Sequence, residues 1–281
     1  MTQSFYGTAP EPRRSDDLLS DYGRFLAERN GPSFRTRDER MTTFDPTLVR
    51  AKLRVDSASF NRNYGRLTDG DLSNEELALL AFVKMNAGEA YGVEVISKAR
   101  KPAHEKPTLA ATIERTLVDE ERYHTKLLVG AAGHFDGLVV GSAWKPPLPL
   151  RALIATLARM PPALFHPLLL AAEIAGVHTF NWMLGRLKSL FRDEPAVRES
   201  MERRLIEVLV DEVGHITFNR VMVGAAGRRV ALPLARLIAE SHRVQDRELI
   251  ALGLEANEAD AIARFDYSDL PDEVRRRAFF A

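Results

Sequence analysis

The chain of 281 residues contains no cysteine. This absence excludes disulfide bonds, thiolate zinc sites, iron–sulfur clusters and redox-active cysteine pairs. Any metal ion that the protein binds must therefore be held by carboxylate and imidazole side chains. The 39 Asp and Glu residues and the 7 His residues supply both kinds of ligand.

The sequence also lacks an excess of charge and a long apolar segment. The formal net charge is zero and the short basic run lies at 275–277, so we expect no nucleic-acid partner. No apolar run reaches the roughly 20 residues that span a bilayer. The most apolar stretch, 161–177, contains His166, Pro167 and Glu173. The first residues carry no apolar signal segment, and we expect a cytoplasmic protein without a membrane span.

Helical periodicity dominates the chain, and strand-like alternation is nearly absent. Residues 1–14 are polar with two prolines and are expected to be disordered, whereas 15–281 are expected to form one helical domain. Ser73 followed by Glu76 is a capping-box signature that begins a long helix. The predicted fold is all-α, a four-helix bundle at about 74–223 with additional N- and C-terminal helices. The main helices are expected at 73–100, 107–132, 162–192, 195–223 and 232–252.

Two similar motifs lie on the second and fourth of these helices. LVDEERYH at 117–124 and LVDEVGH at 209–215 both end in Glu-x-x-His. Side chains at i and i+3 lie one turn apart on the same helical face, so each pair can ligate one ion together. Each pair also interrupts an apolar stripe that faces the core. The four residues are Glu121, His124, Glu212 and His215.

The first and third helices carry a second internal echo, EAYGV at 89–93 and EIAGV at 173–177. Glu89 and Glu173 both lie on core faces. Glu94 is an alternative to Glu89, but it lies off the apolar series. Gly92 and Gly176 stand where the other motifs have histidine, and a glycine inside a helix costs about 1 kcal/mol relative to alanine. Space beside the glutamates, for a ligand or for close helix packing, would explain them.

Four glutamates and two histidines are thus expected to converge. Carboxylate-rich ligation with one imidazole per ion suits iron or manganese, whereas zinc usually takes fewer oxygen ligands and calcium rarely takes imidazole.

This pattern resembles the ferritin-like diiron carboxylate superfamily, in which two helices each supply a Glu and two others each supply Glu-x-x-His. The resemblance covers about 74–223 and implies two iron ions, with manganese or a mixed pair as alternatives. It implies that Glu121 and Glu212 bridge the ions. The implied ligands of one ion are Glu89, Glu121 and His124, and those of the other are Glu173, Glu212 and His215.

The resemblance also implies hydrogen bonds from each histidine to the acid that precedes the opposite motif, here Glu120 and Asp211. An oxygen or substrate pocket is expected beside Gly92, Gly176, Val177 and Phe180. The chain departs from some relatives. Leu128 replaces the tyrosine of the radical-generating ribonucleotide reductase subunit, and Val208 replaces the third histidine of the p-aminobenzoate N-oxygenases, which the chain resembles distantly.

The function that the resemblance implies is a non-haem diiron oxygenase or oxidase. Such an enzyme uses dioxygen to hydroxylate, desaturate or N-oxygenate a small organic substrate. Its electrons must come from a separate reductase or carrier, because the chain has no cysteine cluster and no Gly-rich flavin motif. A ferroxidase or iron-handling protein and a metal-free helical scaffold remain alternatives, and a homodimer remains open.

Overall fold

The computed structural model describes residues 4–7, 14–44, 49–64, 72–138, 140, 148–245, 247–254 and 258–281. Within these ranges, the side chains of 43, 44, 64, 86–89, 149, 150, 236, 240–245 and 258 are not described.

The described chain is all-α, as predicted, and contains no β-strand. An isolated antiparallel bridge joins Ser4 to Asp266. The elements are α1 (Ser15–Asn30), η1 (Pro32–Phe34), α2 (Arg35–Phe44), α3 (Ser57–Tyr64), α4 (Asn74–His104), α5 (Leu109–Ala132), α6 (Leu148–Leu157), α7 (Pro162–Leu190), α8 (Pro195–Gln245), α9 (Arg247–Ala251), α10 (Glu258–Arg264), η2 (Tyr267–Asp269) and α11 (Asp272–Arg277).

The long helices begin where local chemistry favours a start. The predicted capping box of α4 is confirmed, because Ser73 Oγ accepts from the Glu76 amide at 3.2 Å and Glu76 accepts from the Ser73 amide at 2.9 Å. Thr108 caps α5 through its hydroxyl oxygen. Pro162 occupies the first position of α7, where a missing amide hydrogen costs nothing.

Two predicted helix ends differ from the structure. The helix expected to close at about residue 100 continues through Pro102 to His104. The helices expected at 195–223 and 232–252 are joined in α8, which bends at Gly224 with φ 60° and continues to Gln245. A glycine reaches this left-handed conformation without steric cost, so the chain changes direction there without a separating loop.

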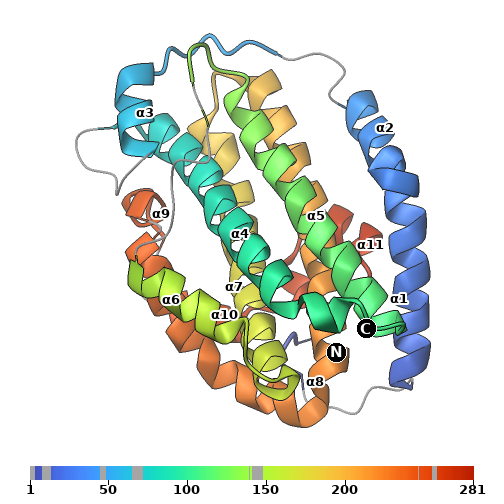
Figure 1. The fold of residues 1–281 in the computed structure, drawn as a ribbon. Helices are drawn as coiled ribbons and strands as arrows, with labels where there is room; N and C mark the ends of the chain where they lie inside the picture. The colour runs from blue at the N-terminus through green and yellow to red at the C-terminus, as the bar shows by residue number, and fades with distance from the viewer. Residues whose placement is uncertain are drawn as a thin grey trace.

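Four long helices, α4, α5, α7 and α8, lie side by side in Figure 1. The most extensive contact is between α7 and α8, followed by that between α4 and α5, and α5 also packs on α8. Their apolar faces form one buried cluster. The N-terminal α1 lies against both α5 and α8, and α6 lies against α4.

Residues 4–7 lie within the segment expected to be disordered, and here they are packed. Phe5 is buried and its ring lies 5.3 Å from that of Phe280, which brings the two ends of the chain together. Arg220 donates hydrogen bonds to the carbonyl groups of Ser4 and Phe5 at 2.8 and 2.6 Å. Residues 1–3 and 8–13 lie outside the described part of the chain.

Among the described helices, α7 is long and apolar enough to cross a membrane by length and composition. Within its most apolar window, 61% of the residues are buried inside the protein. A core helix packed against α8 has the same properties, so this feature is weak evidence for a membrane span.

Candidate metal centre

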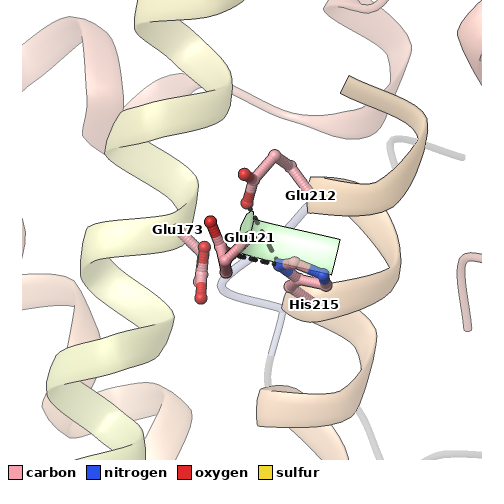
Figure 2. A group of neighbouring side chains, drawn as sticks. All are labelled: Glu121, Glu173, Glu212 and His215. Carbon is pink, nitrogen blue, oxygen red and sulfur yellow. Dashed lines mark ion pairs between the residues drawn. The ribbon is translucent and has the colours of Figure 1, made fainter. Parts of the chain in front are cut away.

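Carboxylate and imidazole groups from three helices meet in the interior. Glu121 comes from α5, Glu173 from α7, and Glu212 and His215 from α8 (Figure 2). Each of these four side chains offers a ligand atom, and the four atoms lie within 4.8 Å of one another. The group can hold a metal ion.

The two Glu-x-x-His motifs face each other with near two-fold symmetry. His215 Nδ1 lies 3.1 Å from Glu121 and 3.4 Å from Glu212. His124 Nδ1 lies 3.4 Å from Glu121 and 3.2 Å from Glu212. Each histidine thus faces both motif glutamates, and each of these glutamates lies between the two imidazoles.

The other nitrogen of each imidazole contacts an acid on the opposite helix. His124 Nε2 lies 2.9 Å from Asp211 Oδ2, and His215 Nε2 lies 3.0 Å from Glu120 Oε2. These are the two pairings that the resemblance implies. A carboxylate accepts hydrogen bonds, so Nε2 donates and Nδ1 of a neutral imidazole keeps its lone pair for the central space.

Residues of α1 and α2 support these two acids from behind, and the sequence analysis missed them. Arg29 Nε donates to Asp211 at 2.5 Å, and Asn30 donates to Glu120 at 2.9 Å. Arg37, whose side chain is fully buried, contacts both acids. The helical periodicity of 16–29 is weak, so the sequence gives no signal that this helix carries buried cations. The arrangement appears only when α1 packs against α5 and α8.

The pKa values of the side chains at the centre reflect a shortage of positive charge. Burial alone would lower the pKa of His124 and His215, but the surrounding carboxylates raise both pKa values well above 6.5. Burial raises the pKa of Glu173 well above its usual range, and the charge of Glu212 raises it further. Protons on these groups offset the negative charge, which is the role that a bound cation would take.

Two buried atoms at the centre test whether a metal fits. Among the described residues, His124 Nδ1 and Glu212 Oε2 have no hydrogen-bond partner. An unpaired buried polar atom costs about 1–3 kcal/mol. Both atoms border the central space, and a nitrogen lone pair and a carboxylate oxygen are ligands that iron or manganese accepts. The residues present therefore fit a carboxylate-bound metal ion.

The sequence offers two candidate metal ligands on α4, Glu89 and Glu94. The Glu89 side chain lies outside the described residues, so its predicted role stays a prediction. The alternative, Glu94, is directed to solvent with 64% of its side chain exposed, where it pairs with Lys98 at 2.5 Å. Gly92, three residues after Glu89, lines a cavity that adjoins the centre.

A cavity of about 380 Å³ adjoins the centre and is lined by Glu121, Glu173, Glu212 and His215. Gly92, Gly176 and Phe180 line it as well. A Cβ atom placed on either glycine would meet nothing within 4 Å, so both positions border open space. Val177 does not line this cavity. Its side chain is fully buried and belongs to the apolar core cluster.

Comparisons of the chain with family models, curated proteins and solved structures find no match.

Proposed function

We propose that the protein is a non-haem diiron oxygenase or oxidase on a ferritin-like four-helix bundle formed by α4, α5, α7 and α8. The observation that carries the proposal is the symmetric placement of His124 and His215, each with Nδ1 facing both Glu121 and Glu212. Such a pattern gives each ion one imidazole and places two carboxylates between the ions.

In this proposal, His124 and His215 would each hold one ion, Glu121 and Glu212 would contribute to holding both, and Glu173 would contribute to one. Glu89 is the expected ligand on the other side. Bound iron would supply the activation of dioxygen and the oxidation of a substrate. Glu120 and Asp211 hold the imidazoles in the tautomer that leaves Nδ1 free for ligation.

The cavity favours an organic molecule, rather than ferrous iron, as the substrate. Between the acids of the centre and its far end, its wall is mainly apolar and includes Ile96, Leu117, Leu169 and Phe180. An apolar wall excludes water and favours a hydrocarbon group. A ferroxidase path would instead need polar groups along its whole length to replace the hydration shell of the ion, whereas the polar residues outside the centre include a cluster around Glu114. The electrons would come from a separate reductase or carrier.

Anaerobic reconstitution with ferrous iron, followed by elemental analysis, tests the proposal. We expect about two ions per chain, and a lower melting temperature after chelation because the ligands lose their counter-charge. Glu212→Ala should lose most of the metal, whereas Glu94→Ala, at an exposed position of α4, should keep it. A wild-type protein without stoichiometric metal would refute the proposal.

A second measurement separates the oxygenase from the ferroxidase. Excess ferrous iron is added to the loaded protein in the presence of dioxygen. An oxygenase keeps its ions and leaves the excess iron largely unoxidised, whereas a ferroxidase oxidises it over many turnovers and releases ferric product.

A further inference from the structure

A second polar cluster lies on the wall of the same cavity, away from the metal centre. Its central residue is Glu114 of α5. Glu114 lies 3.2 Å from Arg100 Nη2, 3.2 Å from His104 Nε2 and 3.4 Å from His166 Nε2. Arg100, His104 and His166 are each more than nine-tenths buried. All four residues line the cavity, whose remaining wall is mostly apolar.

The cluster lies two helical turns from the metal centre. Glu114 precedes Glu121 by seven residues on α5, and His166 precedes Glu173 by seven residues on α7. At 1.5 Å per residue, both separations correspond to about 10 Å along the helices. Two helices thus give the same separation between a polar end of the cavity and its metal end.

Hydrogen bonds fix the orientation of the His166 imidazole. Asn219 Nδ2 donates to the carbonyl oxygen of His215 at 3.0 Å, so its Oδ1 is an acceptor. This oxygen lies 3.0 Å from His166 Nδ1, which therefore donates. In the neutral imidazole, Nε2 then carries a lone pair. It has no hydrogen-bond partner among the described residues, although Glu114 Oε1 lies 3.4 Å away.

With a neutral His166, two acceptors, His166 Nε2 and Glu114 Oε1, face each other at 3.4 Å. The Arg100 guanidinium, which contacts the same oxygen of Glu114 as His166 does, stacks on Phe165 with its central carbon 4.4 Å from the ring centroid. Arg100 Nε is buried and has no partner in the described part of the chain. The cluster thus lacks a group that donates to the two acceptors and accepts from Arg100.

The charge at this end is already balanced. Arg100 and Glu114 form an ion pair. Burial lowers the pKa of His104, which favours its neutral form. A ligand carboxylate has no hydrogen to donate and would meet Glu114, whereas an ammonium group would meet Arg100. An uncharged hydroxyl group both donates and accepts, and it adds no charge to a buried site.

We propose that this end of the cavity binds the hydroxyl group of an otherwise apolar alcohol, whose chain extends along the apolar wall toward the metal centre. The hydroxyl shares its single hydrogen between His166 Nε2 and Glu114 Oε1 and accepts from Arg100. The identification of this alcohol as the substrate rests on the proposed function. Binding of the alcohol itself requires no metal, so the two proposals can fail separately.

Isothermal titration calorimetry of the full chain with 1-octanol, octanoate and octylamine tests this site. The three probes share a chain that reaches about as far as two turns of helix, about 10 Å, and they differ in the polar group. We expect 1-octanol to bind at least about tenfold more tightly than either charged probe, with and without bound metal. Equal or tighter binding of octanoate or octylamine would overturn the proposal, as would the absence of octanol binding.

Variants of the cluster test which side chains contribute to the binding of 1-octanol. His166→Phe should weaken 1-octanol binding about tenfold, because it removes an acceptor for the hydroxyl hydrogen. Glu114→Gln should also weaken it, because a neutral amide oxygen is a weaker acceptor than a carboxylate oxygen. Glu94→Gln, the matched change on the exposed face of α4, should leave it unchanged. Circular dichroism identifies any variant that does not fold, and the comparison of probes on the wild-type protein remains decisive in that case. Unchanged octanol affinity in both folded cavity variants contradicts the site.

Discussion

His215 on α8 and Glu120 on α5 are joined by a hydrogen bond of 3.0 Å between Nε2 and Oε2. The bond orients the imidazole so that Nδ1 faces Glu121 and Glu212. Because Glu120 also accepts from Asn30, its own position is held by α1. The histidine on one helix is therefore positioned by an acid on another, which is in turn positioned by the N-terminal helix.

Glu120→Gln tests this relationship. A neutral amide is a weaker acceptor, so we expect metal affinity to fall by about 10- to 100-fold, the usual effect of losing the partner of a ligating histidine. Competition with a chelator measures the affinity. Asp119→Asn is the matched control, because Asp119 is exposed on the same helix and pairs with Arg122. Equal affinity in the two variants would show that Glu120 does not position His215.

Glu207 should make stability depend on pH. It is 2% exposed and pairs with Arg29, Arg40 and Arg277. Burial alone would raise the pKa of Glu207, but these arginines lower it below 4.5. The unfolded chain therefore takes up the proton first as the pH falls. The stabilisation is complete above the unfolded pKa and is lost as the pH falls through the lowered folded value.

Glu207→Gln should destabilise the protein by about 1–3 kcal/mol at neutral pH, since it weakens charge-assisted hydrogen bonds to Arg29, Arg40 and Arg277, although Arg29 keeps its contact with Asp211. It should also show a smaller loss of stability than the wild type between neutral and acidic pH. Urea unfolding at several pH values measures both effects. Glu199→Gln, which alters an exposed acid of the same helix, should behave like the wild type. A parallel pH dependence in Glu207→Gln would assign the acid sensitivity to other groups.

Glycine is required at position 214 because of a contact with another helix, which the motif LVDEVGH does not reveal. A Cβ atom at this position would lie 2.6 Å from the hydroxyl oxygen of Tyr22 on α1. Gly214→Ala should therefore destabilise the protein by about 1–3 kcal/mol, the usual cost of overpacking. Gly185→Ala, where nothing lies within 4 Å, should instead stabilise α7 by about 0.5–1 kcal/mol. In thermal unfolding, we expect a lower melting temperature than the wild type for Gly214→Ala and a higher one for Gly185→Ala.

Gly176→Leu should fill space beside Glu173 without unfolding the helix, because leucine is the better helix former by roughly 1 kcal/mol. We expect normal metal loading and at least about a tenfold slower reaction of the reduced protein with dioxygen, equivalent to about 1.4 kcal/mol. Stopped-flow absorption measures this rate, and Gly185→Leu at an exposed position of α7 is the control. Normal oxygen reactivity in the loaded Gly176→Leu protein would contradict an access role, and metal loss with unfolding would show close packing instead.

The sequence by itself determined the helical class, the starts of the long helices and the faces on which the motif residues lie. These features are local. The Ser73 capping box acts over three residues, and the spacing of Glu121 and His124 or of Glu212 and His215 places each pair on one face of its own helix. Glu94, which the same periodicity disfavours as a ligand, is exposed to solvent.

Only the tertiary structure decided which side chains meet between helices. Arg29 and Asn30 of α1 and Arg37 of α2 reach the acids behind the histidines because α1 packs against α5 and α8 and α2 follows it closely in the chain. No periodicity within α1 encodes that contact. Val177 lies outside the cavity while Phe180 lines it, a difference of rotation within one apolar helix. A hydrophobic pattern identifies a buried face, but burial is non-directional, so the partner of each buried polar group depends on how the helices pack.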